Sequence, residues 1–198
     1  MRRILFLVLA AACLAAPARA AVVALETDAT TLAVGDSFDV RLTFEAEADE
    51  FLLAFLVDLA WQGAVLEAVT LTDALGPLDF GADGNAFARD FGTFVQLFAV
   101  SDESDAVLAA TQPGAFTIAT LRLTATEAGL LTVTIGALRD FAGAAFGTLD
   151  VTFASDAVSV SVTEAVAPVP LPPALALFGV GLAALVRQRG VRTSASVS

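Results

Sequence analysis

The sequence has no histidine, no lysine and no tyrosine, and Cys13 is its single cysteine. These absences exclude Ser-His-Asp and Cys-His triads, lysine Schiff bases and zinc sites built from histidine and cysteine. A glycosidase would need only two paired carboxylates, but no pair of acidic residues stands out in the sequence. We therefore expect a protein that is not an enzyme.

Positive charge is also scarce. The chain has 198 residues, of which 10 are arginine and 22 are acidic, and its net charge is −12. Residues 21–167 contain all 22 acids and four of the arginines, so this part carries a charge of −18. Because nucleic acids are bound through basic surfaces, we expect no nucleic-acid partner. The apolar share of 57% is too high for a disordered chain.

The N-terminus has the layout of a secretory signal peptide. Two arginines precede an uncharged apolar run, which is followed by small residues. Ala18 and Ala20 place the cleavage site after Ala20, so residues 1–20 are the predicted signal peptide. The alternatives are a short membrane anchor and a lipoprotein signal acylated at Cys13. Cleavage after Ala20 leaves a mature chain without cysteine, so we expect no disulfide.

The C-terminus contains a proline motif, an apolar segment and a basic cluster, in that order. The proline motif consists of Val169, Pro170, Leu171 and Pro172. We predict a single transmembrane helix over about residues 171–186, because proline is tolerated in the first turn of a helix. Its length of roughly 24 Å is slightly below the roughly 30 Å of a bilayer core. Arg187 and Arg189 form the stop cluster that retains this end in the cytoplasm.

Residues 168–192 resemble the C-terminal sorting signal of PEP-CTERM proteins, and residues 193–198 follow as a tail. Leu171 occupies the position of the signature glutamate. The resemblance implies a precursor that crosses the inner membrane, is held there by its C-terminal helix, and is cut near the proline motif by an exosortase-type protease or transpeptidase. The implied destination is the cell surface or the extracellular polymeric matrix. An ordinary single-span anchor is the alternative, because arginines beside a helix do not distinguish sorting from anchoring.

Between these ends, apolar residues recur at every second position, as they do in half-buried strands. Strands are expected at residues 22–26, 38–44, 51–61, 66–72, 94–100, 116–123, 131–135, 148–153 and 158–162. Eight or nine short strands in one domain, residues 21–167, predict an all-β sandwich or jelly roll. A helix is the alternative for residues 51–60, and residues 74–90 are expected to form a long loop.

Three segments of this domain resemble the superfamily of cohesin-like and carbohydrate-binding-module-like β-sandwiches. They are residues 32–40, residues 55–69, and residues 116–123 together with 128–129. The resemblance implies a cohesin-like jelly-roll β-sandwich. Cohesins bind dockerins, but a likeness of fold does not carry function by itself.

Acidic and amide side chains gather in one glycine-rich loop. They are Asp79, Asp83, Asn85 and Asp90. Oxygen ligands of this kind suit Ca²⁺, but their spacing fits no EF-hand. Because loop acids in a strongly acidic protein are usually just solvated, we expect no cofactor and keep a calcium site at these four residues as the alternative.

Trp61 is the single tryptophan, and 15 residues are phenylalanine. Aromatic rings at alternating strand positions are usually core residues, so we expect Trp61 to be buried. A polysaccharide-stacking face around Trp61 is the alternative.

The sequence thus predicts a non-enzymatic exported protein, sorted to the cell surface or the extracellular matrix. The alternative is a carbohydrate- or protein-binding module that a single helix anchors in the membrane.

Overall fold

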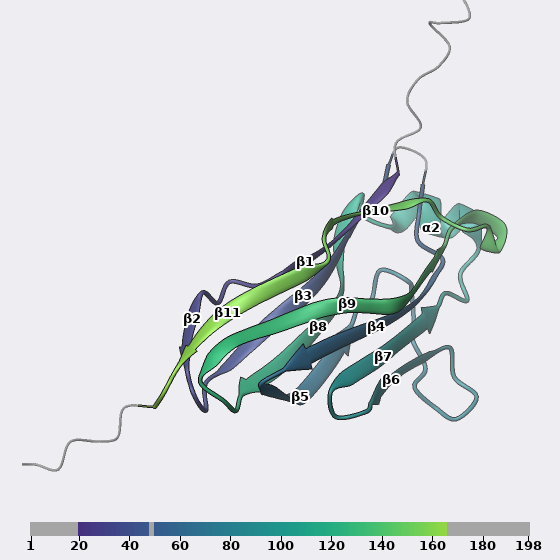
Figure 1. The fold of residues 1–198 in the computed structure, drawn as a ribbon. Coiled ribbons are helices and arrows are strands. Elements are labelled where there is room, and N and C mark those ends of the chain that lie inside the picture. The colour runs from purple at the N-terminus through teal and green to yellow at the C-terminus, as the bar shows by residue number, and fades with distance from the viewer. Residues whose placement is uncertain (1–19, 48–49, 166–198) are drawn as a thin grey trace, which may run out of the picture. The chain divides into compact units, whose positions relative to one another are not determined.

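The computed structural model describes residues 20–47 and 50–165 (Figure 1). Most of the predicted signal peptide, including Ala18, lies outside these residues. So do the proline motif, the predicted helix 171–186, and the stop cluster of Arg187 and Arg189. Within the described residues, no helix is long and apolar enough to cross a membrane.

The described chain forms two β-sheets, which confirms the all-β prediction. The first sheet has the order β10 (Val151–Ser155), β1 (Ala21–Glu26), β3 (Ser37–Glu45), β8 (Ala115–Ala125) and β5 (Ala64–Leu71). The second has the order β2 (Thr31–Ala33), β11 (Ala157–Thr163), β9 (Gly129–Ala142), β4 (Ala54–Gln62), β7 (Phe94–Val100) and β6 (Ala86–Asp90). A helix, α2 (Asp105–Thr111), and a short 3-10 turn, η1 (Ala144–Phe146), join strands at one end.

The core lies between the two sheets and follows from the alternation in the strands. In β3, Phe38, Val40, Leu42 and Phe44 are at most 5% exposed, whereas the residues between them face outward. Successive side chains of a strand point to opposite faces, so one face of each sheet supplies the core. In the opposite sheet, Val57 and Leu59 of β4 are fully buried in the same cluster.

Several sequence predictions need correction. The described residues contain eleven strands rather than eight or nine. The alternative of a helix at residues 51–60 is wrong, because β4 begins at Ala54 and pairs with both β7 and β9. Residues 74–90 are not entirely loop, because their last five residues form β6. This edge strand has four exposed residues in succession and so lacks the alternating pattern.

The helix α2 was also missed. It has seven residues, and Leu108 is its only buried one. A helix this short has no recognisable 3.6-residue period, so its sequence gives no signal of its own.

Candidate functional site

The outer faces of the two sheets differ in chemistry. The outer face of the β3–β8–β5 sheet is polar and carries ion pairs. Arg41 donates two hydrogen bonds of 2.9 Å to the carboxylate of Asp28. Arg122 lies 3.5 Å from Asp39 and 3.3 Å from Glu67. Polar and charged side chains are ordinary on a solvent-exposed surface, so this face by itself does not indicate a binding site.

Glu67 is the most connected acid on this polar face. The hydroxyls of Thr124 and Ser37 donate to its Oε1, and Arg122 lies beside its Oε2. The Thr124 hydrogen bond, followed by the contacts with Ser37 and Arg122, lowers the pKa of Glu67 below its ordinary value of 4.5, although desolvation opposes the shift.

Glu67→Gln is expected to lower the melting temperature at neutral pH. A carboxyl whose pKa is lowered by folding stabilises the fold above its unfolded pKa, and this stabilisation is lost as the pH falls through the folded pKa. The difference from the parent should therefore close as the pH drops below 4.5. Thermal unfolding at a series of pH values measures it, with exposed Glu127→Gln as the control. A constant difference at all pH values would contradict the assignment.

The outer face of the opposite sheet is aromatic where β4, β7 and β6 lie side by side (Figure 1). Here we call it the aromatic face. Its residues are Leu56, Asp58, Ala60, Phe87, Arg89, Phe91, Phe94, Gln96 and Phe98.

The strand register arranges this face in rows across the sheet. Leu56 pairs with Phe98, which pairs with Phe87, and the two phenylalanine rings stack with centroids 5.1 Å apart. At the other end, Ala60 pairs with Phe94, whose ring stacks on Phe91 at 4.5 Å. Phe94 and Phe98 are four positions apart in β7, so the distance between the two aromatic rows is roughly 13 Å.

A polar row lies between the aromatic rows. Asp58 pairs with Gln96, and Gln96 Nε2 donates to Asp58 Oδ1 over 3.3 Å. On the other side of Asp58, the ladder with β9 is interrupted by a bulge. Gly136 fits there because a Cβ on it would lie only 2.8 Å from the Cβ of Asp58. A half-buried carboxylate thus sits between two apolar rows.

Two rings of the aromatic face are open to solvent. Phe87 is 39% exposed and Phe91 is 49% exposed. Single exposed apolar residues are ordinary, but here two stacked pairs lie on one sheet face, one on each side of the polar row. Exposed apolar side chains that cluster in this way mark interaction surfaces in soluble proteins.

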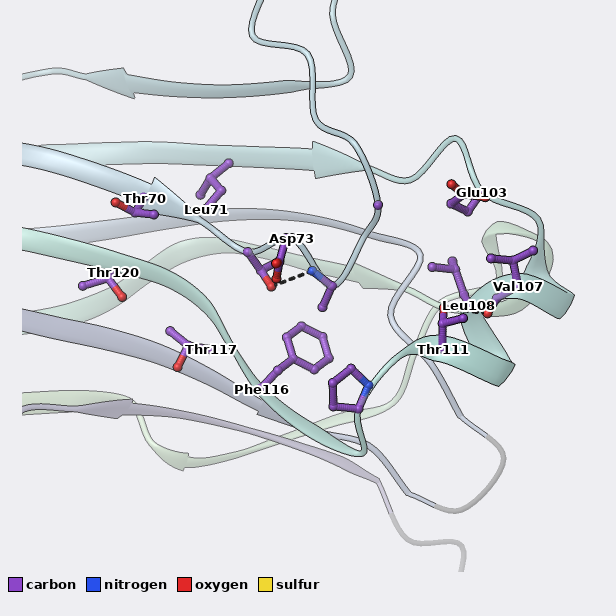
Figure 2. A pocket seen from close by; sticks show the side chains of 14 residues that line it. Thr70, Leu71, Asp73, Glu103, Val107, Leu108, Thr111, Phe116, Thr117 and Thr120 are labelled. Carbon is purple, nitrogen blue, oxygen red and sulfur yellow. Dashed lines mark hydrogen bonds between the residues drawn. The ribbon is translucent and has the colours of Figure 1, made fainter.

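A second feature is a groove at the end of the β5–β8 edge, shown in Figure 2. We call it the end groove. It is open to solvent, has a volume of about 920 Å³, and is bordered by the end of β5, the turn at residues 72–76, α2 and the first half of β8. Figure 2 shows Phe116 below Asp73, with Thr117 and Thr120 farther along β8 and Thr111 on the helix at the opposite side.

Trp61 is buried, as predicted from its position in a strand. It is 3% exposed, and its Nε1 donates to the carbonyl of Ala64 over 3.1 Å. A buried indole cannot stack on a sugar ring, so the polysaccharide-stacking alternative at Trp61 loses its basis.

The structure brings together only some of the candidate calcium ligands. The Asp79 and Asn85 oxygens accept hydrogen bonds from the backbone of Gly81 and Asp79, while Asn85 Nδ2 donates to Asp102. Asp90 is at the far end of β6, where its Oδ1 accepts a hydrogen bond from the backbone N–H of Gly92. Asp83 is exposed in the loop.

In the part of the chain that the structure describes, no group of three or more acidic side chains could hold a metal ion. A calcium site at the four loop residues stays the alternative to our expectation of no cofactor.

No known protein-family profile matches the sequence, and no curated protein matches it. Solved structures do match, over 72–76% of this chain and at low sequence identity. The seventh type I cohesin of ScaB from Pseudobacteroides cellulosolvens is 13% identical, with a TM-score of 0.55, over 76% of this chain and 96% of that one.

Two further structures resemble the chain equally well. A non-cellulosomal cohesin from the archaeon Archaeoglobus fulgidus is 8% identical, with a TM-score of 0.55, over 73% of this chain and 92% of that one. The cohesin of OlpA from Clostridium thermocellum, in a type I cohesin-dockerin complex, is 6% identical, with a TM-score of 0.56, over 72% and 99%. The chain therefore has the β-sandwich fold of cohesin domains, as the sequence resemblance implied.

Proposed function

We propose that the sandwich domain is a non-catalytic protein-binding module and that its aromatic face is the docking surface. The observation that carries this proposal is the pair of stacked phenylalanine rows, Phe87 on Phe98 and Phe91 on Phe94, on the outer face of β4, β7 and β6, with Phe87 and Phe91 exposed to solvent. Burying exposed rings contributes about 25 cal/mol for each Å² removed from water, and aromatic anchors dominate protein interfaces.

The structural neighbours support a protein partner. Two of the similar structures from Clostridium thermocellum are cohesin-dockerin complexes, with 11% and 6% identity to this chain. Likeness at this level concerns the fold, so the partner of this chain is argued from its own surface. The rows of this face suit a partner with two apolar anchors roughly 13 Å apart and a hydrogen-bond donor between them for Asp58.

The two ends of the chain support a location for this module. The signal peptide at residues 1–20 would export the domain, and the sorting signal at residues 168–192 would hold the precursor in the inner membrane until an exosortase-type enzyme cuts it. The domain would then reach the cell surface or the extracellular matrix. Its charge of −18 favours solubility there and discourages contact with anionic surfaces.

The double substitution Phe87→Ser and Phe91→Ser is expected to abolish partner binding. Both rings are exposed, so removing them should leave the fold intact while it removes the apolar anchors. The tagged full chain is used to capture proteins from the envelope and medium of its own organism. The captured protein is identified and purified, and its affinity for each variant is measured. We expect a loss of about a hundredfold or more, since each anchor is worth about 2 kcal/mol.

Val65→Ser is the matched control, because Val65 is 56% exposed on β5, in the other sheet. It should bind the partner like the parent. Equal binding by the parent and the Phe87/Phe91 variant would refute the docking surface, and failure to capture any protein that depends on this face would refute the module.

A further inference from the structure

We infer that the end groove binds a cationic side chain of a partner protein, the guanidinium of an arginine or the ammonium of a lysine. This site lies on the other sheet from the aromatic face, and the inference does not depend on the function proposed above.

The lining of the groove is negatively charged. Asp73 and Glu103 line it, and no basic side chain does. None of the ion pairs within the described residues uses either carboxylate. The lining is thus rich in hydrogen-bond acceptors and uncompensated in charge, so it favours a ligand that brings donors and positive charge. A phosphate or a carboxylate would be repelled.

The apolar part of the groove suits the rest of such a side chain. Phe116 packs on Phe44 with ring centroids 5.4 Å apart and remains half-buried, so part of its ring borders the groove. A cation over the face of an aromatic ring is attracted by the ring quadrupole. Pro113 and Val107 also line the groove and can cover the aliphatic stem of an arginine or lysine.

The walls of the groove are held in place before any ligand arrives. Gly76 N donates to Asp73 O over 2.9 Å and closes the turn, and the buried Ser101 hydroxyl donates to Leu75 O over 2.6 Å. Gln112, at the end of α2, donates to the carbonyls of both Leu52 and Ala74. A preformed site saves the entropy that ordering a loop would cost.

A neutral sugar is the competing ligand, because hydroxyls of Thr70, Thr117 and Thr120 also line the groove. Phe116 is the only aromatic residue in the lining and has no polar group, which makes it a poor sugar platform. The two unpaired carboxylates favour a cation instead.

The test uses the full chain in a non-ionic polyoxyethylene detergent. This detergent contains no sugar, so it cannot act as the competing ligand. N-acetyl-arginine methylamide is titrated while the amide signals of Thr70, Thr117 and Thr120 are followed by NMR. We expect saturable shifts at these residues with a Kd on the order of 10 mM or tighter. The citrulline analogue, which has the same shape without the charge, should give no saturable shift.

Asp73→Asn with Glu103→Gln is expected to weaken binding of the arginine probe about five- to tenfold, as for two exposed ion pairs. Asp83→Asn with Glu127→Gln makes the same change of charge at exposed residues outside the groove and should weaken it less than twofold. Phe116→Leu, which keeps the packing on Phe44 but removes the ring, should weaken it measurably.

Three results would overturn the inference. The first is the absence of saturable shifts with the arginine probe. The second is equal weakening by the two double variants, which would show general attraction to an acidic domain. The third is binding of cellohexaose or mannohexaose at the same amides where the arginine probe does not bind, which would make this a sugar site.

Discussion

Trp61→Ala is expected to lower the free energy of unfolding by about 3–5 kcal/mol, the usual cost of removing a large buried aromatic side chain. The indole is 3% exposed and belongs to the main core cluster between the sheets. The substitution also removes the hydrogen bond from Trp61 Nε1 to Ala64 O, which spans the turn between β4 and β5. Urea unfolding followed by far-ultraviolet circular dichroism measures the loss.

Phe80→Ala is the control for this substitution. Phe80 is 58% exposed, so its removal should change the free energy of unfolding by less than about 0.5 kcal/mol. If Trp61→Ala cost no more than Phe80→Ala, the indole would not be a core residue. Binding to a partner, measured at a temperature where the variant is folded, should be unaffected.

Pro170→Ala with Pro172→Ala is expected to block C-terminal processing almost completely. If residues 168–192 are a sorting signal, the mature parent protein loses the segment 174–198 and leaves the inner membrane. Alanine favours helix, so the variant should still insert in the membrane but lack the motif that the exosortase-type enzyme recognises. Intact mass of the protein from membrane and medium, in a strain with an active exosortase, detects the retained segment.

Pro168→Ala with Pro173→Ala is the matched control. It removes the same number of prolines just outside the motif of residues 169–172 and should be processed like the parent. An unprocessed parent protein, or equal processing of both variants, would mean that the segment is only an anchor. A membrane-spanning helix does not leave the bilayer without cleavage, so release into the medium is itself diagnostic.

The strands that the sequence predicted best are those with one face in the core. β3 and β11 alternate cleanly because burial on one side selects apolar residues at every second position. The predicted strand at residues 51–61 began too early, because residues 51–53 are buried but do not belong to β4. There the apolar run reflects packing under α2 and the loops, and burial alone does not specify a conformation.

The candidate sites were not readable from the sequence. Phe87 and Phe98 stack only because β6 pairs with β7, and β6 has no alternation that would reveal it as a strand. Asp73 and Glu103 are 30 positions apart and share a groove because Gly76 brings the turn against the Glu103 side chain. Hydrogen bonds from Ser101 to Leu75 and from Gln112 to Ala74 hold this turn in place.

By itself the sequence determined the all-β class, the burial of Trp61 and the strong negative charge of the domain, and it predicts the signals at both ends. These follow from composition, short-range period and local motifs, each of which is a property of neighbouring residues. Only the tertiary structure decided which outer face is aromatic, where Asp58 lies within it and which segments form the end groove. Each of these depends on strand register and on contacts between distant residues, because a surface is made where separate segments meet.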